Sequence, residues 1–310
     1  MNKSDSVYIA GHNGLVGSNI LKKLKELGYE NLIYFDRSEY DLVIQSDVNL
    51  LFKEYKPDYV FLAAAKVGGI YANNTFRGDF IYENLMIQTN IIHAAKENDT
   101  KKVLNLGSSC IYPKKSLIPI TENQLLTGKL EVTNEPYAIS KIAGIKLAES
   151  YRLQYGLNVI SLMPTNLYGP GDNFDPQNSH VLPALIQRFH KAKVENVKEV
   201  TCWGDGSPLR EFLYVEDLAD AAIFCMQNYN EIEFINVGTG VDISIKDLAE
   251  LISEIIGYKG SILWDKSNPN GTHQKTLDVT KLTNLGWTPK TELSEGIRRT
   301  YEWFLSNFEL

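Results

Sequence analysis

Short apolar runs alternate with amphipathic patterns along the first half of the chain. The runs are rich in Val, Ile, Leu and Ala and predict buried strands at 7–11, 32–36, 59–65, 103–107 and 159–164. Between them, apolar residues recur every three to four positions, which predicts helices at 15–27, 46–55, 80–97 and 136–155. Strands that are apolar throughout belong to parallel sheets covered by helices on both faces. We therefore expect a doubly wound α/β fold.

The pattern changes after residue 165. Residues 166–180 are rich in Gly, Pro, Asn and Asp and predict a long loop, a kind of segment that is usually functional in compact domains. Beyond it we expect short strands at 201–203, 234–237 and 262–264, and helices at 181–193, 215–228, 244–256 and 292–306. We predict one domain at 1–165 and a smaller α/β lobe at 166–310, with some elements of the lobe returning to the large sheet.

Composition narrows the classes of protein to which this chain can belong. Of 310 residues 44% are hydrophobic, and the net charge of −7 argues against non-specific binding to nucleic acid or to anionic membranes. Three cysteines are too few for a disulfide framework, and no apolar run fits a signal peptide or a membrane span. The five histidines lack the spacing of metal ligands, so no metal is expected. We expect a cytoplasmic enzyme or sensor.

A glycine motif lies between the first predicted strand and the first predicted helix. Residues 11–17 read Gly-His-Asn-Gly-Leu-Val-Gly. Glycines there let the backbone approach a pyrophosphate, which binds to the free amide groups of the helix N-terminus. In this strand–turn–helix context the motif is typical of Rossmann domains that bind a dinucleotide. The residues expected to contact the cofactor here are Gly11, Asn13, Gly14, Leu15, Val16 and Gly17.

The end of the second predicted strand bears on the identity of that dinucleotide. Asp36 would accept a hydrogen bond from the ribose 2′-hydroxyl of NAD, whereas Arg37 would bind the 2′-phosphate of NADP. The sequence leaves this choice open. Further contacts are expected from residues that follow or end the second and third strands: Asp41, Leu42, Ala63, Ala64 and Ala65.

A tyrosine and a lysine lie about one helical turn apart in the helix predicted at 136–155. Tyr137 and Lys141 share a face of that helix, and a nearby ammonium would lower the pKa of the phenol toward working pH. Such a tyrosine can exchange a proton with a carbonyl oxygen during hydride transfer. Ser108 follows the fourth strand, at the sheet edge where ligands of open α/β sheets bind, and could bond the same oxygen. These residues predict a site for carbonyl reduction.

Longer stretches extend this set of residues over nearly the whole chain. They are AGHNGLVGS, AAAKVGGIYANN, LGSSCIYP, NEPYAISKIAG, MPTNLYGPGDNF, NSHVLPALIQRFH and WGDGSPLREFLYVEDLA. In these stretches the chain resembles the extended short-chain dehydrogenase/reductases that act on nucleotide sugars, and among them the GDP-L-fucose synthase family of 3,5-epimerase/4-reductases. No Asp-Glu pair lies next to Ser108, which disfavours dehydratase chemistry.

The resemblance implies roles for individual residues. Ser108, Tyr137 and Lys141 correspond to the reductase triad, and Cys110 and His180 to the pair that epimerises the sugar. Further cofactor contacts are implied for Pro164, Asn166, Leu167 and His180. Binding of the GDP-sugar is implied for Ser108, Asn166, Val181, Arg188, Trp203, Arg210 and Lys275, in which the arginines would bind the diphosphate.

The resemblance also implies a cofactor and an assembly. NADPH is the expected cofactor, but Asn13 stands where relatives that use NADPH often carry an arginine, so NADH stays open. A homodimer is expected through the helices near 80–97 and 136–155, with apolar faces that contain Ile81, Leu85, Ile92, Ile142, Ile145 and Leu147. The alternative is that these faces pack against the sheet. Two other functions stay open. One is a 4-ketoreductase without epimerase activity, for example on a GDP-4-keto-heptose, and the other is a non-catalytic dinucleotide sensor.

Overall fold

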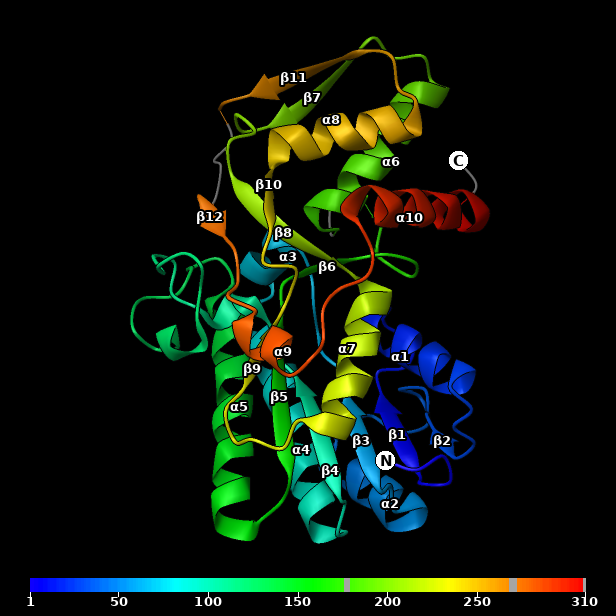
Figure 1. The fold of residues 1–310 in the computed structure, drawn as a ribbon, viewed down its shortest axis with the longest axis vertical. Helices are drawn as coiled ribbons and strands as arrows, with labels where there is room; N and C mark the ends of the chain where they lie inside the picture. Colours follow the sequence, from blue (N-terminus) through cyan, green and yellow to red (C-terminus); the bar gives the residue numbers. More distant parts are fainter. Residues whose placement is uncertain (176–178, 268–271, 309–310) are drawn as a thin grey trace.

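The large sheet consists of six parallel strands in the order β2-β1-β3-β4-β5-β9 (Figure 1). The computed structural model describes residues 1–175, 179–267 and 272–308. The strands are β1 Val7–Ala10, β2 Leu32–Ile33, β3 Tyr59–Leu62, β4 Lys102–Leu106, β5 Val159–Pro164 and β9 Ile235–Val237. Because β2 and β3 lie on opposite sides of β1, the strand order reverses there, and this makes a topological switch point. The predicted doubly wound parallel sheet is confirmed.

Helices cover both faces of this sheet. One layer contains α1 Leu15–Glu26 and α7 Val215–Asn228, and the other contains α2 Gln45–Tyr55, α4 Arg77–Glu97 and α5 Glu135–Tyr155. Successive side chains of a strand point to opposite faces, so each strand supplies apolar residues to both layers. This explains why the strands read as continuous apolar runs in the sequence.

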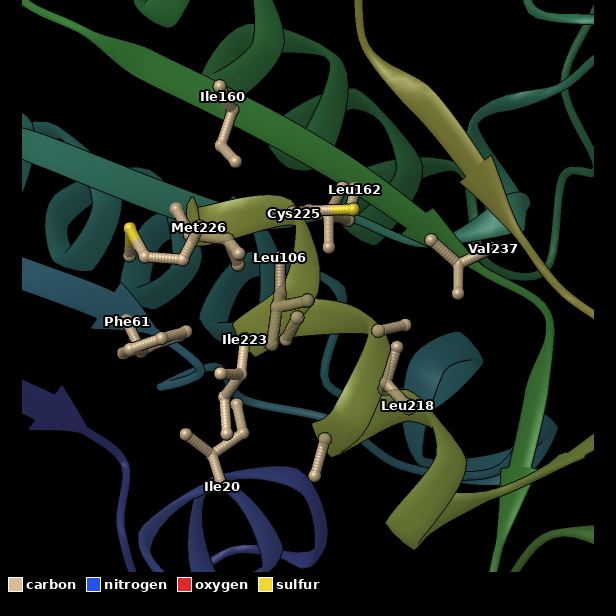
Figure 2. Packing of buried hydrophobic residues seen from close by; sticks show 14 of the residues in the cluster. Ile20, Phe61, Leu106, Ile160, Leu162, Leu218, Ile223, Cys225, Met226 and Val237 are labelled. Atoms are coloured by element: carbon tan, nitrogen blue, oxygen red, sulfur yellow. The ribbon is translucent and has the colours of Figure 1, made fainter. Parts of the chain in front are cut away.

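Figure 2 shows the layer of α1 and α7 against the sheet. Ile20 of α1 and Ile223 of α7 are buried in one cluster with Phe61, Leu106 and Leu162 of three neighbouring strands. Helix α7 comes from the second half of the chain, as does β9 at the sheet edge. The C-terminal half therefore contributes elements to the large sheet.

The second lobe lies beyond the carboxyl ends of the large sheet's strands (Figure 1). Its larger elements are α6 Val181–Val194, α8 Ile245–Ile256, α10 Leu293–Asn307 and the parallel pair β7 Glu199–Trp203 and β11 Ser261–Asp265. A small mixed sheet joins β6 Asn166–Tyr168, β8 Leu209–Tyr214, β10 Asp242–Ser244 and β12 Gln274–Lys275. Short helices complete the chain: α3 Ile70–Thr75, η1 Ser109–Ile111, η2 Glu122–Gln124 and α9 Thr280–Asn284. In the described ranges, no helix has the length and apolar character needed to cross a membrane.

Two strands end three residues earlier than predicted, and four further strands are not predicted at all. β2 ends at Ile33 instead of residue 36, because it pairs only with β1 and the chain then turns, with the amide of Asp36 donating to the side chain of Glu39. β3 ends at Leu62 instead of residue 65, where the neighbouring β1 gives way to the glycine loop. The unpredicted strands are β6, β8, β10 and β12, and β6 lies within the loop predicted at 166–180, of which residues 176–178 are outside the described residues. The other predicted elements begin and end within three residues of the structure.

Lys102, the first residue of β4, buries its ammonium group beneath the C-terminal end of α7. Its Nζ donates hydrogen bonds to the carbonyl oxygens of Cys225, Met226 and Tyr229 at 3.2, 2.7 and 2.6 Å, and to Asn230 Oδ1 at 3.1 Å. A cation at this end of a helix bonds carbonyls of the last turn and complements the helix dipole. Lys102 therefore fastens α7 to the sheet.

Replacing Lys102 by methionine is expected to lower the free energy of unfolding by about 2 kcal/mol, because buried carbonyl groups lose a charged donor. Urea unfolding followed by circular dichroism measures this. Lys191→Met is the matched control, since Lys191 and its partner Glu195, 3.8 Å away, are both exposed at the end of α6, and surface pairs contribute little. An equal loss in both variants would contradict the role assigned to Lys102.

Candidate active site

The glycine loop and the end of β3 meet at the switch point of the sheet. Gly11 follows β1 with φ of +84°, and a Cβ there would lie 2.7 Å from Ala64 Cα. A Cβ on Gly17 would lie 2.1 Å from the carbonyl oxygen of Gly11. Both contacts are too close for a side chain, so the loop requires glycine at these positions. Ala63 and Ala65, on either side of Ala64, are half-buried along the same edge.

The N-terminus of α1 is available to a ligand. Gly14 precedes the helix, no side chain caps it, and its first turn contains no acidic residue. Leu15, Val16 and Gly17 begin the helix, and the first amide groups of a helix have no carbonyl partner within it. This N-terminus and the bare glycine backbone fit a pyrophosphate, so these residues can hold a dinucleotide.

Polar side chains surround the segment that follows β2. The carboxylate of Asp36 accepts a hydrogen bond from the side-chain amide of Asn13. Arg37 donates through Nε to Asp41 at 3.0 Å and through Nη1 to Glu83 at 3.3 Å. The structure thus brings together Asn13, Asp36, Arg37 and Asp41, four of the residues predicted to contact the cofactor. It adds Glu83 of α4, which no motif in the sequence singles out.

Ser108, Cys110, Tyr137 and Lys141 meet at the carboxyl end of β4. Ser108 caps η1, and its Oγ accepts a hydrogen bond from the amide of Cys110 at 3.2 Å. Tyr137 lies in the first turn of α5, where its phenol hydrogen-bonds with Ser108 and interacts electrostatically with Cys110. Lys141 Nζ donates to the carbonyl oxygen of Leu106 at 2.8 Å and lies 5.8 Å from the centre of the Tyr137 ring. The structure brings these four predicted residues together.

The surroundings of Tyr137 shift its pKa in the direction opposite to the one expected from the sequence. Burial raises the pKa of the phenol above its usual value, Cys110 adds to this, and the hydrogen bond with Ser108 opposes it only in part. Burial also lowers the pKa of Lys141 to about 8. The expectation that Lys141 lowers the pKa of Tyr137 is therefore wrong, because desolvation of a phenolate outweighs an ammonium that is directed at Leu106. Tyr137 is protonated at neutral pH, as a proton donor must be.

Three residues predicted to bind the sugar nucleotide share one face of the mixed sheet. Arg210 of β8 is paired in register with Lys275 of β12, and Phe212 of β8 is paired with Asn166 of β6. Residues paired across strands, and residues two apart on a strand, lie on the same face. Asn166, Arg210 and Lys275 therefore line one surface. The guanidinium of Arg210 donates to the carbonyl oxygen of Leu209 at 2.7 Å.

Other predicted residues lie on α6 and β7. His180 immediately precedes α6 and Val181 begins it. Desolvation by the surrounding protein lowers the pKa of His180, although its side chain stays accessible. Arg188 donates from α6 to the carbonyl oxygen of Thr201 at 2.9 Å, which ties α6 to β7. Trp203 ends β7 and is 70% exposed.

Three residues predicted to contact the cofactor are held by the protein core. Pro164 is buried at the end of β5, and Leu42 and Leu167 are half-buried against the clusters on opposite faces of the large sheet. Only part of each residue is therefore accessible to a cofactor. Within the described ranges, no group of three or more His, Cys, Asp and Glu side chains is placed to hold a metal ion.

A buried glutamate on β8 organises the lobe in a way that the sequence does not reveal. The carboxylate of Glu211 accepts hydrogen bonds from the amides of Thr239, Gly240 and Leu277 at 2.6, 2.9 and 2.8 Å. Its carbonyl oxygen accepts one from Asn166 Nδ2 at 2.8 Å. Glu211 therefore joins β6, β8 and the segment after β12, and it fixes the backbone of the face that carries the predicted cations.

Comparisons with known proteins agree with this geometry. Residues 7–238 match the model of the NAD dependent epimerase/dehydratase family. GDP-L-fucose synthase 1 of Arabidopsis thaliana is 56% identical over 98% of this chain and 94% of its own length, and GDP-L-fucose synthase of Escherichia coli (strain K12) is 53% identical over 97% of each. Among solved structures, MlghC, a GDP-mannoheptose C4 reductase of Campylobacter jejuni with NADP bound, is 40% identical with a TM-score of 0.92 over 98% of this chain and 99% of that one. The chain belongs to the NAD-dependent epimerase/dehydratase family and, within it, to the GDP-L-fucose synthase family.

Proposed function

We propose that this chain is an NADPH-dependent enzyme that inverts carbons 3 and 5 of GDP-4-keto-6-deoxy-mannose and reduces its 4-keto group, giving GDP-fucose. The observation that carries the proposal is the meeting of Ser108, Cys110, Tyr137 and Lys141 at the carboxyl end of β4, in the sheet whose switch point holds the dinucleotide loop. The identity to GDP-L-fucose synthases over nearly the whole chain supports the choice of sugar.

Reduction needs a proton at the 4-keto oxygen while hydride reaches carbon 4. The nicotinamide supplies that hydride when the cofactor is bound. Burial raises the pKa of Tyr137, so its phenol is protonated and donates to the oxygen. Ser108 holds the same oxygen by a hydrogen bond. Lys141, anchored at the carbonyl of Leu106, stabilises the phenolate that the transfer leaves behind.

Epimerisation uses the same ketone. The carbonyl group acidifies the hydrogens at carbons 3 and 5, because the resulting carbanion is delocalised as an enolate. The Cys110 thiolate removes a proton from one face, and the His180 imidazolium returns a proton to the opposite face, which inverts the centre. The thiol then loses its proton to solvent and the imidazole takes one up from solvent, so the pair is reset before the second centre reacts. Desolvation lowers the pKa of His180, so its imidazolium, once formed, gives up its proton more easily than an unperturbed one does. Cys110 is also the one partly exposed thiol of the three.

The GDP moiety binds in the second lobe. Arg188, Arg210 and Lys275 supply the positive charge for its diphosphate, and Trp203 offers an exposed ring that can stack on the base or cover the sugar. In the described part of the chain Arg210 has no carboxylate within ion-pair distance, so its charge is available to an anion. Residues 1–165 therefore bind the cofactor, and residues 166–310 mainly bind the sugar nucleotide.

The enzyme works as a cytoplasmic homodimer. Helices α4 and α5 run side by side (Figure 1), and their outer surface offers exposed or half-buried apolar residues: Ile81, Tyr82, Leu85, Ile139 and Leu147. The remaining residues expected at this interface are buried inside the single chain and do not reach a partner: Ile92, Ile142 and Ile145. Sedimentation equilibrium should give twice the chain mass of 35.0 kDa, and a monomeric mass would contradict the dimer.

Turnover of GDP-4-keto-6-deoxy-mannose with NADPH in deuterium oxide, followed by NMR of the product, tests the function. We expect GDP-fucose with deuterium at carbons 3 and 5. A reduced product without this deuterium would leave a 4-ketoreductase. No reaction would overturn the substrate and direct the assay to GDP-4-keto-heptoses, given the similarity to MlghC. Cofactor binding without turnover of any keto sugar would indicate a dinucleotide sensor.

A further inference from the structure

Among the described residues, the carboxylate of Asp36, which follows β2, forms no ion pair with a lysine or arginine. The side chain of Asp36 is 59% exposed, accepts a hydrogen bond from Asn13 and lies 3.7 Å from His12 Nε2. Both contacts use Oδ1, which leaves Oδ2 for another donor. The amide of Asp36 donates to Glu39 at 2.9 Å, so a second carboxylate lies beside it. In the described chain no lysine or arginine pairs with Asp36.

The cations near this carboxylate are already paired with other acids. Arg37 forms ion pairs with Asp41 at 3.0 Å and with Glu83 at 3.3 Å. Lys66, which follows the alanines at the end of β3, pairs with Glu83 at 2.5 Å and with Asp79 at 3.6 Å. Two cations therefore share three carboxylates, and the carboxylate at the end of β2 adds a fourth. This rim of the cofactor site is negative overall.

A negative rim disfavours binding of a ribose 2′-phosphate and favours binding of a ribose 2′-hydroxyl. The phosphate must draw Arg37 away from its acidic partners and is repelled by Asp36. The hydroxyl is neutral and can donate to Oδ2 of Asp36. Asn13 holds that carboxylate in place but brings no positive charge to offset it, whereas an arginine at this position would do so. Arg37 thus favours the 2′-phosphate, whereas Asp36, held in place by Asn13, favours the 2′-hydroxyl.

We infer that Asp36 and Asn13 relax the choice of cofactor, so that the chain binds the NAD(H) pair about as well as the NADP(H) pair. Arg37 binds the 2′-phosphate of NADPH, and Asp36 accepts the 2′-hydroxyl of NADH. Asp36 is the residue that sets the ratio of the two affinities. The inference relies on the proposed function only for turnover, because its direct readout is the binding of cofactor to the free protein.

Isothermal titration calorimetry of the whole chain with NADP⁺ and NAD⁺, without sugar, tests this. We expect the two dissociation constants to agree within about tenfold. Asp36→Ala should weaken NAD⁺ by about tenfold and strengthen NADP⁺, and Asn13→Arg should strengthen NADP⁺ by about tenfold. Glu97→Gln is the control: it removes one exposed negative charge at the other end of α4 and should leave the ratio unchanged.

Two results would overturn the inference. The first is NADP⁺ binding by the unaltered chain more than about a hundredfold tighter than NAD⁺ binding. The second is an unchanged ratio in Asp36→Ala. If both cofactors bind as expected but the GDP-keto-sugar is not converted, the proposed function fails and the inference stands. If the sugar is converted with NADPH and NAD⁺ does not bind, the inference fails and the proposed function stands.

Discussion

Replacing Tyr137 by phenylalanine is expected to slow reduction of the 4-keto group by about 10²–10⁴-fold, the contribution typical of a positioned general acid. The change removes one hydroxyl from a ring that otherwise keeps its edge-on contact with Phe80. Cofactor and GDP-sugar should still bind, because the glycine loop and the cationic face of the second lobe are untouched. Single-turnover measurement of NADPH oxidation, together with calorimetric binding of both ligands, separates these effects.

Tyr155→Phe is the matched control for this variant. Tyr155 ends the same helix, is 48% exposed and lies at the far end of α5 from the reacting centre. Its turnover should match that of the unaltered chain. A Tyr137→Phe protein that keeps more than about a tenth of the rate would exclude the phenol as the essential proton donor. Loss of cofactor binding in that variant would instead assign Tyr137 a binding role.

The larger elements of the fold are predictable from the sequence because their burial pattern repeats many times. The strand predicted at 159–164 is β5, and the helix predicted at 136–155 is α5 with one more residue at its start. The sequence of β8 lacks a repeating pattern of buried apolar residues. Its sequence LREFLY places Glu211 in a strand, and that glutamate is fully buried because amides from residues 239, 240 and 277 satisfy its carboxylate. Distant segments supply those partners, and no local pattern reveals them.

In the candidate site, too, some features are predictable from the sequence and others are not. Ser108, Tyr137 and Lys141 are predictable because strand ends and a one-turn helical spacing fix which residues can meet. The direction of the pKa shift at Tyr137 is not predictable from that spacing. It depends on how deeply the phenol is buried and on where the ammonium of Lys141 points, and both are set by tertiary packing. Glu83 is missed for the same reason, since only the fold brings it to Arg37.

Replacing Cys110 by alanine is expected to separate epimerisation from reduction. Without the thiolate, deuterium incorporation at carbons 3 and 5 in deuterium oxide should slow by about 10²–10⁴-fold, because removal of each proton loses its base. Ser108, Tyr137 and Lys141 keep their contacts, since Ser108 Oγ accepts a hydrogen bond from the backbone amide of residue 110 and not from its side chain. NMR of the sugar over time, with and without NADPH, measures exchange and reduction separately.

Cys225→Ala controls for the loss of a thiol as such. Cys225 is fully buried in the core between α7 and the large sheet, so its replacement should leave exchange at both carbons unchanged (Figure 2). His180→Asn should slow reprotonation, so that the enolate partitions back to unepimerised ketone that has exchanged its hydrogen. Exchange at both carbons at the unaltered rate in Cys110→Ala would exclude the thiol as the base. In that case Cys110 would be a neighbour of Tyr137 that adds to its raised pKa and takes no part in proton removal.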